Sequence, residues 1–245
     1  MQDIDWTINT PDGHKIYGIT NYISGVEDRK KVVVMVHGLR AHKNVYQFKS
    51  AVPEFHARGY HVMRFDLYYD GEQGRCLTDC TLAIHARDLQ EVIKQKCGEF
   101  EQVFLVGHSY GGPTVMLANP EGVQGASLWD PSFVLQGRGL PEVPGFGYLS
   151  TGSYQSILGE NFCAEWNEYS LEKCLDISSQ AHFPVQVIHA GKGAHAQAEK
   201  SWHSACKLDS CREVIADADH CFYASDTAQE LHAMTLEWFD KCSAV

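Results

Sequence analysis

The hydrophobic positions of the chain follow two alternating patterns. Short runs rich in Val, Ile, Leu and Phe predict buried strands, and longer stretches with apolar residues three and four positions apart predict helices. The clearest run, Val32–Val36, contains no polar residue and therefore fits a strand that is covered on both faces. The same reasoning predicts further strands at Tyr60–Phe65, Val103–Val106, Ala126–Trp129, Val185–His189 and Glu213–Ala216.

Helical periodicity occupies the stretches between these runs. It is clear in Thr81–Lys96, around Tyr46–Arg58, and from about Thr227 to Asp240. Strands that alternate with helices predict a mostly parallel sheet with helices on both faces. The first residues differ, because the extended runs Ile4–Asn9 and Lys15–Tyr22 flank the turn signal Pro-Asp-Gly. We expect a β-hairpin that enters the sheet.

Residues 131–182 break this alternation. The segment is rich in glycine, proline and aromatic residues. A structureless loop of this length is unusual in a compact domain. We therefore expect one domain over residues 1–245, with 131–182 as an inserted cap whose aromatic side chains partly line a substrate site and partly pack the cap onto the body.

Charge and composition narrow the classes of partner. The formal net charge of -11 is spread along the chain, which argues against a nucleic acid or an anionic membrane as partner. No stretch approaches the roughly 18 apolar residues of a membrane span, and the N-terminus lacks the pattern of a secretory signal, so we expect a cytoplasmic protein. The nine cysteines are odd in number and scattered, which indicates reduced thiols. The oligomeric state has no signal in the sequence.

A nucleophile motif gives the first indication of chemistry. Gly107-His108-Ser109-Tyr110-Gly111 directly follows the predicted strand Val103–Val106 and precedes the helix-compatible Pro113–Ala118. In this context G-x-S-x-G forms a sharp strand-to-helix turn that strains the serine backbone and exposes its hydroxyl. The following helix directs its N-terminus at developing negative charge. We expect Ser109 to be a nucleophile.

The chain resembles the α/β-hydrolase superfamily over nearly its whole length. The resemblance rests on His37-Gly38 after the first buried run, on Phe65-Asp66, on the serine motif and on a late histidine. It implies an α/β-hydrolase fold, with an oxyanion hole made by the backbone N–H groups of Leu39 and Tyr110. It also implies a general base on the loop after the last strand, where His220 stands.

The acid of the expected triad is displaced. In the superfamily it commonly follows the strand before the last, in a pattern like I-H-G-x-x-D, but residues 188–193 read Ile-His-Ala-Gly-Lys-Gly. Glycine therefore occupies the acid position. Asp130, at the end of the predicted strand Ala126–Trp129, is the first choice, because haloalkane dehalogenases and certain lipases of this superfamily carry their acid there. Glu199 and Asp219 remain alternatives.

These residues predict a serine esterase that acts on a small, apolar acyl or aryl ester through an acyl-enzyme. No cofactor or metal is expected, because the histidines and cysteines show no recognisable ligand spacing. Arg40, His42 and Lys43 follow the oxyanion loop and could meet an anion, although a solvated surface loop is the simpler interpretation. A thioesterase or carbon–carbon bond hydrolase with the same triad, and a non-catalytic ligand-binding receptor of this fold, stay open as alternatives.

Overall fold

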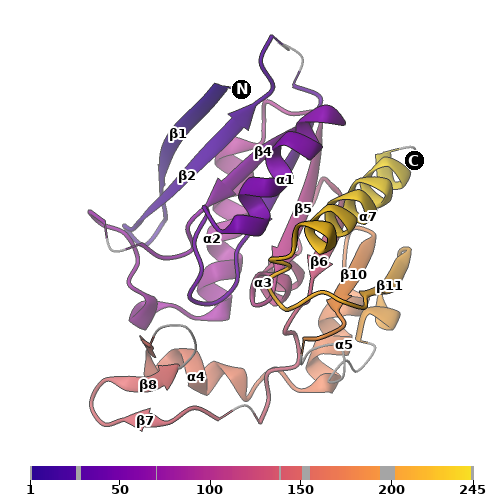
Figure 1. Ribbon diagram of the computed structural model, residues 1–245. Coiled ribbons are helices and arrows are strands. Elements are labelled where there is room, and N and C mark those ends of the chain that lie inside the picture. Colours follow the sequence, from indigo (N-terminus) through magenta and orange to yellow (C-terminus); the bar gives the residue numbers. More distant parts are fainter. Residues whose placement is uncertain are drawn as a thin grey trace.

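An eight-stranded sheet forms the centre of the computed structural model (Figure 1), which describes residues 2–25, 29–69, 71–137, 139–150, 155–193 and 202–243. The strand order is β1-β2-β4-β3-β5-β6-β10-β11. Pairs β1–β2 and β2–β4 are antiparallel, and the other pairs are parallel. The strands are β1 (Gln2–Asn9), β2 (Lys15–Tyr22), β3 (Lys31–Val36), β4 (Tyr60–Phe65), β5 (Gln102–His108), β6 (Val123–Trp129), β10 (Val185–Ala190) and β11 (Ser210–Ile215).

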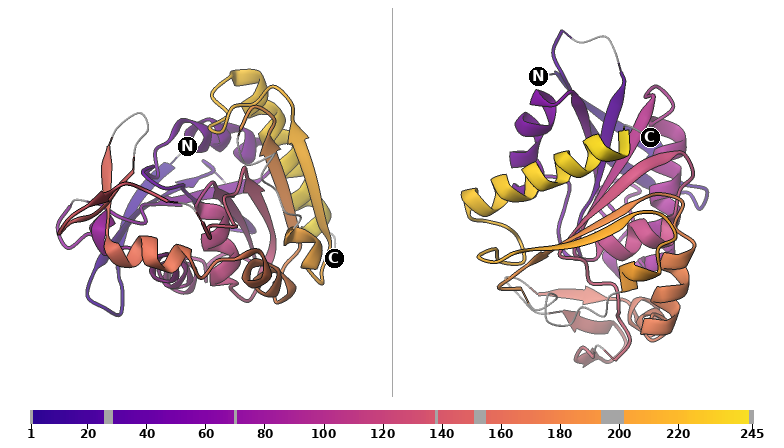
Figure 2. Two further views of the ribbon diagram at one scale, coloured as in Figure 1. Left: turned by 90° about the horizontal axis from the view of Figure 1, so that it is seen from below. Right: turned by 90° about the vertical axis from the view of Figure 1, so that its right-hand side faces the viewer.

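Helices cover both faces of this sheet, and the right-hand view of Figure 2 separates the two layers by colour. One face carries the purple α1 (Tyr46–Ala57) and the yellow α7 (Ser225–Ser243). The other carries α2 (Leu82–Lys96), α3 (Gly111–Ala118) and α5 (Leu171–Ser179). The predicted mostly parallel sheet with helices on both faces is therefore confirmed.

Strand β3 shows why its sequence lacks alternation. Val32 and Val34 pack into the core under α2 and α3, whereas Val33 and Met35 pack into the core under α1 and α7. Successive side chains of a strand point to opposite faces, so a strand with two covered faces needs apolar residues at every position. All four side chains are fully buried.

The expected N-terminal hairpin is confirmed as β1 and β2, which pair antiparallel from Gln2↔Tyr22 to Asn9↔Lys15. The last strand, expected at Glu213–Ala216, is present but begins earlier and runs over Ser210–Ile215. This strand lies at the edge of the sheet and most of its side chains are partly or fully exposed, so no continuous apolar run marks it.

The chain between β6 and β10 forms a second, smaller sheet. Its antiparallel strands are β7 (Glu142–Val143), β8 (Gly147–Ser150) and β9 (Ser156–Leu158), followed by helix α4 (Glu160–Trp166) and then α5. Figure 1 shows β7, β8 and α4 at one end of the main sheet. The 3-10 turns η1 (Leu77–Asp79) and η2 (Trp202–Ala205) complete the described elements.

An aromatic cluster joins α4 to the main body. The ring of Tyr110 stacks on Phe162 of α4, with centroids 5.2 Å apart, and meets the edge of His85 from α2 at 5.9 Å. His85 is fully buried, and neither of its ring nitrogens has a hydrogen-bond partner among the described residues. Burial lowers the pKa of His85 to about 3, so this ring is neutral in the folded protein.

The buried His85 predicts a loss of stability in mild acid. Below its ordinary pKa of 6.5, this histidine takes up a proton in the unfolded chain but not in the folded chain. The stability that depends on neutral His85 is therefore complete above pH 6.5 and decreases as the pH falls toward 3. Between pH 7.5 and pH 5, the unfolding free energy of the wild-type protein should decrease by about 2 kcal/mol more than that of His85→Phe. Urea denaturation of both proteins at the two pH values measures this difference, and an identical decrease in both would contradict it.

Candidate active site

Neighbouring strands deliver the candidate residues to one edge of the sheet. His37-Gly38-Leu39 follows β3, Ser109 follows β5, and Asp130 follows β6. The strands β3, β5 and β6 are neighbours in the sheet, in this order. His220 lies on the loop between β11 and α7. Because parallel strands present their carboxyl ends at the same edge, residues far apart in sequence converge there.

The turn at Ser109 has the strained backbone that the sequence motif predicts. Ser109 has φ of 53°, in the left-handed region, and its N–H donates to the carbonyl of Trp129 at 2.9 Å. A Cβ at Gly111 would lie 2.1 Å from the carbonyl oxygen of Val36, and one at Gly107 would lie 2.6 Å from the carbonyl oxygen of Gly111. Only glycine therefore allows the helix to start so close to β3 and β5.

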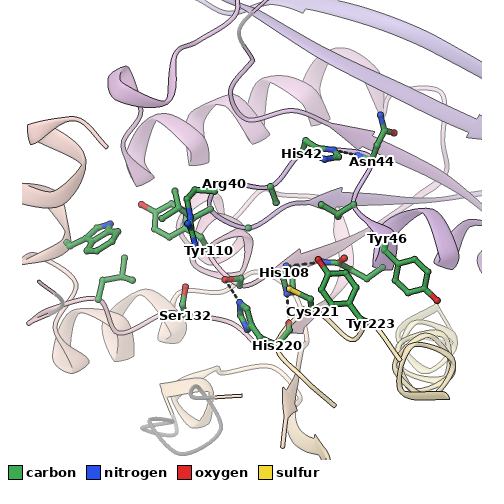
Figure 3. Close-up of a pocket in the computed structure, with 18 residues that line it drawn as sticks. Arg40, His42, Asn44, Tyr46, His108, Tyr110, Ser132, His220, Cys221 and Tyr223 are labelled. Atoms are coloured by element: carbon green, nitrogen blue, oxygen red, sulfur yellow. Dashed lines mark hydrogen bonds between the residues drawn. The ribbon is translucent and has the colours of Figure 1, made fainter. Parts of the chain in front are cut away.

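A continuous chain of hydrogen bonds joins the three predicted catalytic residues. His220 Nε2 lies 3.0 Å from Ser109 Oγ, drawn as the dashed line at His220 in Figure 3. His220 Nδ1 lies 2.5 Å from Asp130 Oδ2. Because an ionised carboxylate only accepts hydrogen bonds, Nδ1 carries the proton and Nε2 is left to accept from the serine hydroxyl.

Asp130 is fully buried and has its own donors. Its Oδ1 accepts a hydrogen bond from the N–H of Ala190 at 3.2 Å and lies 3.2 Å from Nδ1 of the buried His189. A buried carboxylate needs such donors to stay ionised. The carboxylate thus lies between β6 and the end of β10, close to the usual position of the acid in this fold.

Gly193, the glycine at that usual position, leaves room for the displaced acid. A Cβ at Gly193 would lie 2.7 Å from Asp130 Oδ2. An aspartate at position 193 and the one at position 130 would occupy the same space. The chain therefore has an aspartate after β6 and a glycine at the corresponding position after β10.

The other candidate acids differ from Asp130 in their placement. Asp219 Oδ1 accepts from the N–H groups of Cys221 at 2.8 Å and Tyr223 at 3.4 Å, and so closes the loop that carries His220. Glu199 lies outside the described residues. Of the three carboxylates that the sequence leaves open, Asp130 is the one that the described structure brings to His220.

The expected oxyanion donors lie at the same edge. Leu39 and Tyr110 both line the cavity at Ser109, and within the described ranges neither backbone N–H donates a hydrogen bond to another protein group. The buried His37 fixes the first loop: its Nδ1 donates to the carbonyl of Gly38 at 2.8 Å, and its Nε2 accepts from the N–H of Leu67 at 3.0 Å. Burial lowers the pKa of His37 to about 4, which keeps this bridge neutral.

His108 has a position that the sequence analysis missed. Its Nε2 lies 2.8 Å from the carbonyl oxygen of His220. Because a carbonyl oxygen only accepts, Nε2 carries the hydrogen and donates the hydrogen bond. Its Nδ1 accepts from the amide of Gln47 at 3.2 Å, as Figure 3 shows. The residue before Ser109 therefore ties the serine turn to the loop of His220. The motif tolerates any residue at this position, so no local pattern signals the contact.

A cavity of about 530 Å³ opens onto Ser109 and His220 (Figure 3). Leu135 and Trp166 from the segment between β6 and β10 contribute to its lining, whereas other aromatic residues of that segment, such as Phe133 and Phe162, are buried in the core. The apolar wall expected from this segment is therefore small.

The basic residues after the oxyanion loop separate into two kinds. Arg40 and His42 line the cavity. Lys43 instead donates its backbone N–H to the buried Asp66 at 2.7 Å and pairs its ammonium group with the same carboxylate. Asp66 thus holds the loop that follows β3.

The described part of the chain contains no group of three or more His, Cys, Asp or Glu side chains placed to hold a metal ion. None of the nine cysteines, all of which lie in described segments, forms a disulfide bond. Among the residues with described positions, no helix is both long and apolar enough to cross a lipid bilayer.

The packing of Gly193 against Asp130 gives a test of the acid position. In the serine esterase that the sequence predicts, Gly193→Ala should displace the Asp130 carboxylate from His220 and reduce kcat for p-nitrophenyl acetate by on the order of 100-fold, because small misplacements of reacting groups carry costs of this size. Gly98→Ala is the matched control, since its Cβ would meet nothing within 4 Å. Equal kcat values for both variants, with unchanged melting temperatures, would show that the carboxylate lies elsewhere.

Comparisons with known proteins agree with this architecture. The model of the Alpha/beta hydrolase family matches residues 33–233. Similar solved structures include Est1E from Butyrivibrio proteoclasticus with ferulic acid bound (TM-score 0.83, 16% identity, 98% of this chain and 100% of that chain) and the esterase domain of a Rhodothermus marinus protein (0.70, 18%, 97% and 98%). A monoacylglycerol lipase from Paleococcus ferrophilus is also similar (0.69, 16%, 93% and 99%). No curated protein matched the sequence significantly. With four fifths of its length matched by the family model, the chain belongs to the α/β-hydrolase family.

Proposed function

We propose that this protein is a serine hydrolase that cleaves small carboxylic esters, with Ser109 as nucleophile, His220 as general base and Asp130 as the acid that orients His220. The observation that carries the proposal is the hydrogen-bonded chain from Ser109 Oγ through His220 to the buried Asp130, with distances of 3.0 and 2.5 Å. Ser109 and His220, at one end of this row of hydrogen bonds, line a cavity.

The first half of the reaction forms an acyl-enzyme. His220 Nε2 accepts the hydroxyl proton of Ser109 while Oγ attacks the ester carbonyl carbon. Negative charge then develops on the carbonyl oxygen, and the N–H groups of Leu39 and Tyr110 stabilise it. When the tetrahedral intermediate collapses, the protonated His220 gives its proton to the leaving alcohol.

The second half releases the acid. Water takes the place of the alcohol, and His220 removes its proton as the water oxygen attacks the acyl carbonyl. When this second tetrahedral intermediate collapses, the bond to Ser109 Oγ breaks and His220 returns the proton to Oγ, which regenerates the serine. Asp130 stays ionised throughout. It keeps the Nδ1–H of His220 directed away from the serine and stabilises the imidazolium that forms in each half.

The cavity supports a small substrate. Its volume of about 530 Å³ lies within the range of small-molecule sites, and Leu39, Leu135 and Trp166 give it apolar walls. Est1E, a protein of similar fold, was solved with ferulic acid bound. Esters of small aryl acids are therefore the first substrates to test.

We further propose that residues 1–245 act as one α/β-hydrolase domain, with 131–182 as a cap beside the cavity. Trp166 and Leu135, which line the cavity from this segment, support the cap. The unpaired state of all nine cysteines, which the described segments include, favours a reducing compartment, and we propose the cytoplasm.

A labelling and kinetic experiment tests the assignment. A fluorophosphonate probe should label the wild-type protein at Ser109, and Ser109→Ala should reduce kcat for aryl and p-nitrophenyl esters by about a millionfold. Asp130→Asn should retain labelling at a reduced rate and lose about 10⁴-fold in kcat, because the asparagine no longer favours the required tautomer of His220.

The alternative acids provide controls. Asp219→Asn keeps the oxygen that accepts from Cys221 and Tyr223, so its loop and its activity should be retained. Glu199→Gln should also retain activity. Wild-type activity in Asp130→Asn, together with its loss in either control, would move the acid away from Asp130, and an unlabelled Ser109 would refute hydrolysis by this serine.

A further inference from the structure

Two exposed tyrosines stand at the open side of the cavity. Tyr46 begins α1, and Tyr223 lies three residues after His220. Their rings are 6.1 Å apart and tilted by 44°, they are 43% and 61% exposed, and both line the cavity. Large aromatic side chains left exposed next to one another, beside a reactive serine, indicate a surface that a ligand covers.

The position of the pair relative to His220 decides which part of a substrate it meets. Figure 3 shows Tyr46 and Tyr223 on one side of His220 and shows Tyr110 and Arg40 on the other. The oxyanion donors, Leu39 and Tyr110, hold the carbonyl oxygen on the Tyr110 side in the proposed reaction. His220 must also reach the leaving oxygen to protonate it. The alcohol therefore leaves along the loop of His220, toward Tyr223 and Tyr46.

We propose that Tyr46 and Tyr223 form a leaving-group subsite for an alcohol that carries a ring with an apolar face, which is an aryl ring or a sugar ring. The proposal rests on the proposed esterase function and deepens it by naming the class of alcohol. The rings are too close to admit a third ring between them, so the alcohol packs against their exposed faces and edges.

The remaining residues on this side fit such an alcohol. His42 and Asn44 are exposed and also line the cavity, so the cavity that the two tyrosines border carries polar side chains as well. His42 Nδ1 accepts from the N–H of Asn44 at 3.1 Å, and Asn44 Oδ1 accepts from Arg64 at 3.0 Å, so both side chains are held in place. A ring alcohol with hydroxyl groups would find an apolar contact at the two tyrosines and polar side chains elsewhere in the same cavity.

The reaction itself separates a leaving-group subsite from an acyl subsite. Once the acyl-enzyme forms, the alcohol has left, and only the acyl group remains attached to Ser109. Removal of a tyrosine from the proposed subsite should therefore slow acylation by ring-bearing esters and leave the hydrolysis of the acyl-enzyme unchanged.

The experiment compares acetate esters that differ only in the alcohol: ethyl acetate, benzyl acetate and 6-O-acetylglucose. Tyr46→Ala and Tyr223→Ala should each lower kcat/KM about 3- to 10-fold for benzyl acetate, for 6-O-acetylglucose or for both, and should leave ethyl acetate unchanged. Tyr69→Ala is the matched control, because Tyr69 is 46% exposed and does not line the cavity. The deacylation rate, measured from the burst with p-nitrophenyl acetate, should be the same in all four proteins.

The three acetate esters distinguish an aryl alcohol from a sugar alcohol. A loss confined to benzyl acetate assigns an aryl alcohol, and a loss confined to 6-O-acetylglucose assigns a sugar. Equal losses for all three acetates, no loss for any, a change in deacylation, or a loss that follows the acyl ring of ethyl benzoate would overturn the subsite. None of these results affects the proposed function, which fails if the wild-type protein cleaves no ester or if Ser109 is not labelled.

Discussion

The proposed mechanism requires the fully buried carboxylate of Asp130 to keep its charge beside His220. Burial of an isolated carboxylate favours its protonated form, and a protonated acid would no longer hold the Nδ1–H of His220. The donors around it meet this requirement. The N–H of Ala190 and the ring of His189 reach Oδ1 from the end of β10, and His220 reaches Oδ2 from the loop after β11. Three separate parts of the chain must converge for the carboxylate to remain an acceptor.

The sheet order provides this convergence. β6 lies between β5, which ends just before Ser109, and β10, which contains His189 and ends at Ala190, so an acid after β6 can reach the space normally filled from the loop after β10. Gly193 leaves that space open. The hydrogen bond from His108 to the carbonyl of His220 then holds the loop of His220 against the turn at Ser109. The distance between Ser109 and His220 thus depends on contacts made by residues that take no part in the proposed chemistry.

Much of this arrangement could be predicted from local sequence. The apolar run of β3, the helical spacing of α2 and the Pro-Asp-Gly turn each depend on residues that are close in the chain, and each element is where its pattern predicts. The family resemblance led to His220 and Asp130, which lie at the expected sheet edge, although their catalytic roles stay predictions. The first residues of the edge strand β11 were missed because their exposure removes the apolar pattern.

The missed features depend on contacts between distant residues. His108 meets a carbonyl 112 residues away, and Tyr46 meets Tyr223 across the cavity mouth, and neither contact leaves a periodic pattern in the sequence. The role of Gly193 is similar. The sequence shows that the usual acid is absent there, but only the packing shows that a side chain at this position would collide with Asp130.

The most direct test of this account observes the Asp130–His220 hydrogen bond itself. In protein labelled with ¹⁵N-histidine, the proton on His220 Nδ1 should give a resonance far downfield of the amide region, because it lies in a short, charge-assisted hydrogen bond. This resonance, assigned by its absence in His220→Gln, should also disappear in Asp130→Asn and persist in Glu199→Gln and Asp219→Asn. Its persistence in Asp130→Asn, with loss in one of the other two variants, would contradict the assignment of Asp130 as the acid.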